Sequence, residues 1–276
     1  MTALSISKAW DDSKEILARD GRLFVSVALC LVALPTVITG LISPRGMADP
    51  EGPMWVSVVG LIASLVALAG QLALIRLALA PSVTVAEAIG HGARRTLIYL
   101  VAAILVVIAL FLIAIPFVFV LAAIGVPVTK TSATTIESSP GLGVAAILYF
   151  AVFCYIGVRM VMSAPVATAE PVGPIATLRR SWDLTAGHWW KLFGFLALFF
   201  IGAMFLLYAV GLAIGAVVSL SLGPVQPLST SALVMALVHS LLNAALTTVL
   251  AVMLARIYVQ LAGRAEVEAS VPSTGI

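Results

Sequence analysis

A long stretch without charge near the C-terminus limits this chain to very few kinds of fold. From Leu192 to Ala255 the sequence contains no Asp, Glu, Lys or Arg. A helix needs about 20 apolar residues to cross the roughly 30 Å of hydrocarbon in a bilayer, so this stretch is long enough for two crossings. Gly223, Pro224 and Pro227 divide it, because Gly and Pro interrupt helices. The stretch therefore predicts a helical hairpin in a membrane.

The composition extends this prediction to the whole chain of 276 residues. Hydrophobic residues make up 62% and charged residues 10%, and the mean hydropathy is +1.17. Soluble domains are about 45–50% apolar and about 25% charged, which excludes a soluble enzyme, a disordered chain and a coiled coil. The apolar runs lack the two-residue alternation of barrel strands, so we expect an all-α, polytopic membrane protein.

We expect one domain, over residues 1–262, followed by a short cytoplasmic tail at 263–276. Pro35 falls inside its first span and predicts a kink there. The domain contains six transmembrane helices in three hairpins, at about 23–43, 54–80, 96–124, 142–164, 191–220 and 230–258.

The basic residues predict the orientation of these spans. Of the 15 Lys and Arg residues, only Arg45 and Lys130 fall on one side of the expected membrane. Cytoplasmic loops carry the excess of Lys and Arg, which places both termini in the cytoplasm. We therefore expect a multi-pass protein of a bacterial cytoplasmic (inner) membrane. Because the basic residues flank spans, the net charge of +3 does not indicate nucleic-acid binding.

The sequence pattern predicts three copies of one structural unit. A cytoplasmic amphipathic segment precedes each hairpin, at residues 6–17, 84–95 and 175–184, and the Trp-Asp pair at 10–11 recurs at 182–183. Such segments favour the plane of the membrane interface, with Trp toward the acyl chains. Four tryptophans are the expected interfacial anchors: Trp10, Trp182, Trp189 and Trp190.

Basic residues in and beside these segments are candidates for contact with lipid head groups. Each could gain about 1 kcal/mol near an anionic leaflet. The alternative, that these segments only anchor the helices, accounts for the same pattern and stays open. The candidate head-group contacts are Arg94, Arg95, Arg179, Arg180 and Lys191.

A polar stripe lies inside the last span. His239, Asn243 and Thr247 recur every four residues and therefore share one face of a helix. Polar groups inside a membrane usually face the interior of the bundle. The stripe predicts either hydrogen bonds between helices or the lining of a pathway, and the residues alone leave both open.

One segment resembles a known family. Residues 179–194, Arg-Arg-Ser-Trp-Asp-Leu-Thr-Ala-Gly-His-Trp-Trp-Lys-Leu-Phe-Gly, are similar to the segment before the fifth span of the membrane domain attached to some glycerophosphodiester phosphodiesterases. Stand-alone relatives of that domain form the YciC-type inner-membrane family, and the run Arg159, Pro165, Glu170 is similar to that group too. The resemblance implies the same six-span layout. It transfers no catalytic residue, because in the fused proteins the chemistry belongs to a separate soluble barrel.

The sequence offers no reaction chemistry. Cys30 and Cys154 lie in apolar runs without a neighbouring His or carboxylate, and the chain has no phosphate-binding or hydrolase motif. We therefore expect a non-enzymatic scaffold or accessory factor without a cofactor, for membrane partners or lipid organisation. Its expected partners are the bilayer, anionic lipids and other membrane proteins. The alternative is a transporter or permease subunit that uses the polar stripe.

The predicted topology can be tested with a reporter enzyme that is active only outside the cytoplasm. We expect no activity from a fusion at the C-terminus and activity from one inserted near Thr131, because an odd number of spans precedes that loop. The opposite pattern would contradict the orientation.

Overall fold

A computed structural model describes residues 4–43, 53–80, 83–123 and 140–270 of the chain. Over these residues all regular structure is helical, and six helical stretches are long and apolar enough to cross a membrane, which confirms the all-α, multi-pass prediction. The elements are α1 (Ile6–Ala28), a π-helical turn η1 (Leu29–Ala33), α2 (Leu34–Ile42), α3 (Met54–Leu79), α4 (Val85–Ala123), α5 (Pro140–Met160), α6 (Ser163–Ala169), α7 (Pro174–Thr185), α8 (Trp189–Leu222) and α9 (Thr230–Ser270).

The amphipathic segments join their spans in two different ways. The first two continue without a break into the following span, through α1 and through α4. The third forms a separate helix, α7, which the turn around Gly187 separates from α8. Gly187 has a positive φ of 76°, which a residue without Cβ adopts at no steric cost.

Two prolines shape the spans that contain them. Pro35 follows η1 directly, and such a π-helical turn removes the clash between a proline ring and the carbonyl four residues earlier. In the fourth span, which covers Gly143–Ala169, α5 ends at Met160 and α6 begins at Ser163. Pro165 explains this break, because a proline is tolerated in the first turn of a new helix but not inside a continuing one.

Hydroxyl side chains cap the N-termini of three helices. The Ser5 side chain accepts a hydrogen bond from the Lys8 amide at the start of α1, and Ser229 does the same for the Ala232 amide of α9. At the start of α4, Thr84 and Glu87 bond each other's backbone amides, which is a capping box. These bonds satisfy amides that a helix leaves unpaired at its first turn.

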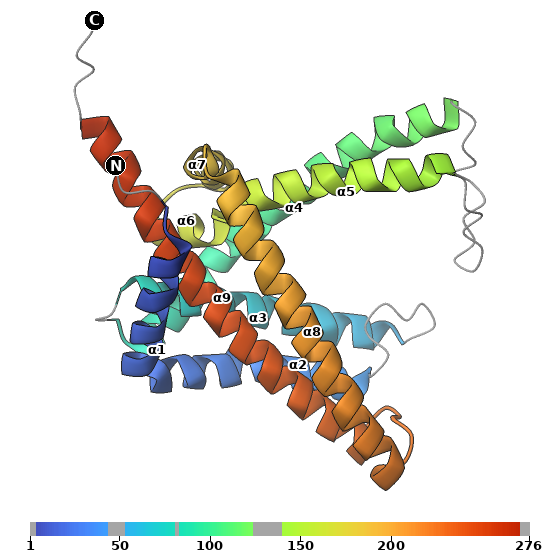
Figure 1. Cartoon of the computed structure of the whole chain (residues 1–276). Coiled ribbons are helices and arrows are strands. Elements are labelled where there is room, and N and C mark those ends of the chain that lie inside the picture. The colour runs from blue at the N-terminus through green and yellow to red at the C-terminus, as the bar shows by residue number, and fades with distance from the viewer. Residues whose placement is uncertain (1–3, 44–52, 81–82, 124–139, 271–276) are drawn as a thin grey trace, which may run out of the picture.

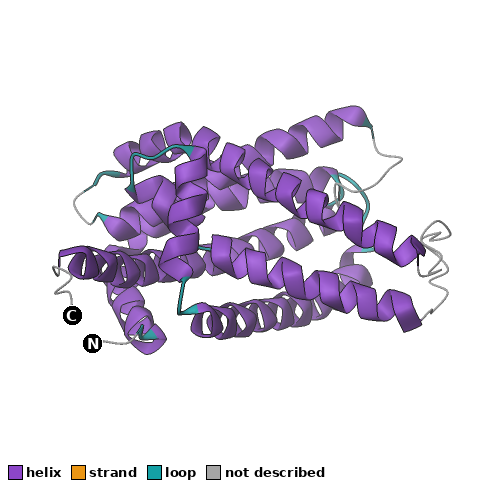
Figure 2. Cartoon of the chain, turned by 90° about the horizontal axis from the view of Figure 1, so that it is seen from above, coloured by secondary structure: helices purple, strands orange, loops and turns teal. Residues whose placement is uncertain are grey.

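α9 lies at the centre of the packed part of the molecule, against α1, α2, α3 and α8 (Figure 1). The view from above shows that helices make up nearly all of the described chain (Figure 2). Its inner face presents Ala251, Val252, Ala255 and Ile257, all fully buried. Small side chains let helix backbones approach closely, and this is the main source of association between helices in lipid. The core is therefore built around the second half of α9.

The start of α1 is held against the far end of α9, so both termini of the described chain lie at one end of the molecule (Figure 1). Asp12 pairs with Arg256 at 3.3 Å. Ser5 and Gln260 bond each other twice, the Ser5 amide to Oε1 at 3.2 Å and Nε2 to the Ser5 carbonyl at 3.3 Å. An even number of spans requires this arrangement.

Away from that end, the helices separate into a packed body and two looser pairs. In the most apolar stretch of α3, 33% of the residues are buried, against 6% in α4 and in α8. α5 meets α8 where Trp189 contacts Tyr155, and beyond this contact the α4/α5 and α8/α9 pairs diverge (Figure 1). Most of the surface of α4, α5 and α8 therefore faces lipid.

Glycines mark the closest approaches inside the packed body. A Cβ placed on Gly92 of α4 would lie 2.7 Å from the Ala69 carbonyl oxygen of α3 and 3.0 Å from the Ala73 amide nitrogen. A Cβ on Gly70 of α3 would lie 2.6 Å from Cβ of Leu31 in η1. Only glycine allows these backbones to come so close.

We predict that Gly92→Ala destabilises the protein and that Gly90→Ala does not. Position 90 lies on the same helix with nothing within 4 Å of its Cβ, so alanine there should gain about 0.5–1 kcal/mol in helix propensity. Alanine at position 92 must push α4 away from α3, at a cost of about 1–3 kcal/mol. Thermal unfolding of both variants in the same detergent measures the difference. Equal unfolding temperatures would contradict the close contact.

Candidate functional site

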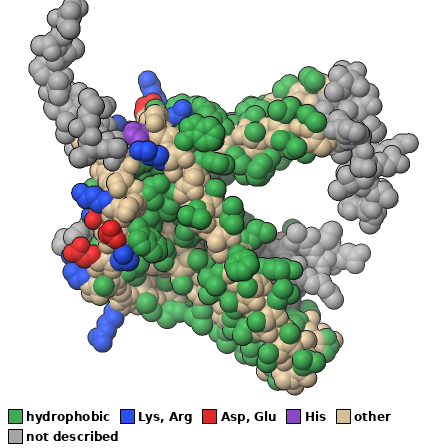
Figure 3. Space-filling view, in the orientation of Figure 1, with side chains coloured by type: hydrophobic (Ala, Val, Ile, Leu, Met, Phe, Trp, Pro, Cys, Tyr) green, Lys and Arg blue, Asp and Glu red, His purple; other side chains and the backbone are tan. Residues whose placement is uncertain are grey.

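The charged side chains visible on one face of the molecule gather at the end where α1 begins and α9 ends (Figure 3). The five predicted head-group residues lie in the first turns of α4, in α7 and at the start of α8. Arg94, Arg179 and Lys191 are exposed, whereas Arg95 and Arg180 are half-buried.

Two of these five residues are used inside the protein. Arg180 Nε donates to Glu170 Oε1 at 3.2 Å, and the Tyr258 hydroxyl donates to the same oxygen at 2.8 Å. Glu170 therefore joins α7 to α9. Lys191 Nζ lies 3.4 Å from the carbonyl oxygen of Leu4, which ties the start of α8 to the N-terminus. Arg94, Arg95 and Arg179 remain as candidates without such a role.

Sequence reasoning did not single out Arg159 as a site residue, and the structure gives it an aromatic enclosure. Its guanidinium lies 5.0 Å from the centroid of the Trp182 ring and 5.4 Å from that of Tyr155. It also donates to the Trp182 carbonyl at 3.3 Å and to the Tyr155 hydroxyl at 3.2 Å. The four-residue spacing of Tyr155 and Arg159 on one helix was the available signal.

Three of the four predicted anchors belong to this aromatic cluster. Trp189 stacks on Phe193 at 4.9 Å and packs against Tyr155 at 5.9 Å, with Trp190 edge-on to it at 4.6 Å. Trp190 is 78% exposed. Trp10 lies on α1, outside the cluster, and is exposed as well. The cluster joins the ends of α5, α7 and α8 at the charged end.

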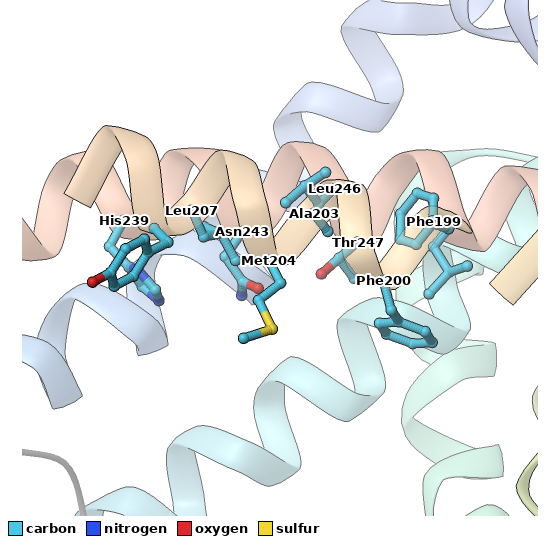
Figure 4. Close-up of a pocket in the computed structure, with 11 residues that line it drawn as sticks. Phe199, Phe200, Ala203, Met204, Leu207, His239, Asn243, Leu246 and Thr247 are labelled. Atoms are coloured by element: carbon cyan, nitrogen blue, oxygen red, sulfur yellow. The ribbon is translucent and has the colours of Figure 1, made fainter. Parts of the chain in front are cut away.

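The polar stripe lines a groove between α8 and α9. His239, Asn243 and Thr247 point to the same side of α9, where Met204 and Phe200 of α8 extend alongside them (Figure 4). The groove has a volume of about 490 Å³. Its lining consists of Phe199, Phe200, Ala203, Met204, Leu207, Tyr208, His239, Asn243, Leu246, Thr247 and Leu250.

Neighbouring polar residues of α9 behave differently from the stripe. Ser240 and Thr248 are buried, and their hydroxyls donate to the carbonyls of Leu237 at 2.9 Å and Ala244 at 2.7 Å. Among the residues that the structure describes, no side-chain hydrogen bond satisfies His239, Asn243 or Thr247. The stripe thus lines a groove. Among the described residues, it makes none of the side-chain hydrogen bonds between helices that were the other prediction.

The sequence matches the family described as Domain of unknown function (DUF7847) over residues 4–261. The search of curated proteins returned no match, and neither did the search of solved structures. These comparisons do not test the resemblance to the membrane domain of glycerophosphodiester phosphodiesterases, which stays a prediction.

We predict that Arg159→Lys lowers stability by about 1–2 kcal/mol, because an ammonium lacks the planar fork with which the guanidinium packs against both rings while it bonds the Trp182 carbonyl and the Tyr155 hydroxyl. Arg179→Lys is the matched control, since Arg179 is an exposed residue of α7. The measurement is the thermal unfolding temperature of each variant in the same detergent. A similar shift for both variants would show that the stacking contributes nothing specific.

Proposed function

This chain belongs to the DUF7847 family, and we propose that it is a non-enzymatic accessory protein of a bacterial inner membrane that organises lipids or membrane partners. Both termini lie in the cytoplasm in this proposal. The observation that carries it is the contrast between a packed, charged end and helices whose membrane faces are almost wholly uncovered.

The uncovered helices support a role in association. Only 6% of the residues in the apolar stretches of α4 and α8 are buried, and 11% in the stretch that contains α5. Exposure to lipid costs little, because lipid tails are as apolar as leucine. These faces are therefore free to exchange lipid for a partner helix without loss of stability.

The charged end supports contact with anionic lipids. Arg94 and Arg179 are exposed, and Arg179 lies on α7 three residues before the exposed Trp182, which is the usual arrangement of residues at a membrane surface. Arg94, Arg95 and Arg179, which make no ion pair with another residue that the structure describes, would together gain about 3 kcal/mol from an anionic leaflet. The bound lipid would then lie against α4 and α7.

The second candidate is a transporter or permease subunit, and the groove lined by His239, Asn243 and Thr247 favours it. Broken helices and internal repeats are common in transporters. The three expected repeats, however, each contain an even number of spans and therefore share one orientation. Inverted repeats would need an odd number per unit.

Native mass spectrometry of the protein released from nanodiscs with anionic lipid tests the proposal. The wild type is compared with a variant in which Arg94, Arg95 and Arg179 become Gln. Arg180 is left unchanged because it pairs with Glu170. The control replaces Lys8, Lys14 and Arg22, three exposed basic residues of α1, by Gln.

We expect anionic lipid to be retained at fixed stoichiometry by the wild type and the control, and to be lost from the Arg variant. Retention of a membrane protein partner instead would support the association role. Equal loss from variant and control would show only general attraction to charge. Reproducible turnover of a lipid substrate by the purified chain would overturn the proposal.

A further inference from the structure

The groove between α8 and α9 opens on the surface of the molecule, about midway along the apolar stretches of both helices. His239 comes nine residues after the start of α9, and Arg256 comes nine residues after Thr247. At 1.5 Å per residue, about 14 Å of helix separates each end of the stripe from the ends of the apolar segment. Phospholipid head groups stay at the membrane surface and do not reach this depth.

The groove holds hydrogen-bonding groups that the described protein leaves unsatisfied. The imidazole of His239, the amide of Asn243 and the hydroxyl of Thr247 all line it, together with the phenol-bearing Tyr208. An unpaired amide or hydroxyl in an apolar environment costs about 2–7 kcal/mol. A ligand that supplies both donors and acceptors would remove this cost.

The chemistry of the lining restricts what this ligand can be. No Lys, Arg, Asp or Glu is among the lining residues, so nothing there would neutralise a charged head group. Phe199 and Phe200 form part of the wall on α8, and aromatic rings pack well against flat rings. The groove suits an uncharged molecule with a flat, polar ring.

The α8 wall argues against a helix as the occupant. Helices in membranes associate through small residues that let backbones approach. Phe200 and Met204 are instead large and exposed, and they extend into the open side of the groove (Figure 4). These side chains keep the backbone of a neighbouring helix away from α8, whereas a thin ring fits between them.

We propose that the groove between α8 and α9 binds a neutral, ring-bearing lipid of the prenylquinone kind, which enters sideways from the bilayer. Its ring carbonyls or hydroxyls bond to Asn243, Thr247 and His239, and its ring lies against Phe199 and Phe200. Its apolar tail extends into the surrounding lipid. This site is separate from the charged end and does not depend on the accessory function proposed above.

Photolabelling of the full-length protein in nanodiscs tests the site. The probe is a ubiquinone analogue whose decyl tail carries a diazirine at the carbons next to the ring, and the labelled peptides are identified by mass spectrometry. Unlabelled decyl-ubiquinone is the competitor. A second probe has the same diazirine-bearing tail without the ring. It separates recognition of the ring from partition of a tail into any apolar groove.

The variant is Asn243→Leu with Thr247→Val, which removes hydrogen bonds and keeps the volume of the side chains similar. The control is Thr248→Val, the same change one residue further along α9. Thr248 is buried and bonds its own helix at Ala244, so this control alters no group in the groove. Thermal unfolding of each variant reports whether the fold is intact.

We expect saturable labelling of residues 199–208 and 239–250 by the ring probe, removed by the competitor. Loss of two hydrogen bonds in the membrane should raise the half-saturation concentration about tenfold in the double variant, and Thr248→Val should leave it unchanged. Equal labelling by the tail-only probe would overturn the proposal even if the double variant fails to fold. Labelling that the competitor does not reduce would overturn it as well.

Discussion

The close packing of the inner face of α9 against α1, α2 and α3 is the contact on which the rest of the molecule depends. In lipid the hydrophobic effect does not drive helices together, so the fold needs short-range contact between small residues and a few hydrogen bonds. Ala251, Val252 and Ala255 supply the first of these, and Gly70 and Gly92 extend it to η1 and α4. α8, which carries large side chains such as Phe200 and Met204, packs against α9 but leaves most of its own surface exposed.

As a result, the helices are bonded to one another at the charged end of the molecule and diverge toward the other end. At the charged end, polar side chains from distant segments form hydrogen bonds with one another. Arg256 donates to Asp12, and Arg180 and Tyr258 both donate to Glu170. Such bonds fix α1 and α7 against α9. Toward the other end the α4/α5 and α8/α9 pairs diverge, and their faces are left to lipid or to partners (Figure 1).

The two candidate sites follow from this division. The charged end presents the exposed Arg94 and Arg179 and the exposed Trp182 and Trp190, which suits contact with head groups. The groove presents neutral hydrogen-bonding groups at a depth that charged groups avoid. α9 takes part in both halves: the buried residues of its second half, such as Ala251 and Ala255, hold the body together, and His239, Asn243 and Thr247 line the groove further toward its start. The same helix therefore contributes to stability and to recognition along different parts of its length.

The sequence by itself determined the all-helical class, the six spans and the shared face of His239, Asn243 and Thr247, because apolar length and helical spacing are local properties. It could not tell Thr247 from Thr248, adjacent and chemically identical, of which one lines the groove and the other is buried. It also missed the enclosure of Arg159 by Trp182, a residue 23 positions away. Only the tertiary structure decided these points, because which face of a helix turns inward depends on the small residues of its neighbours.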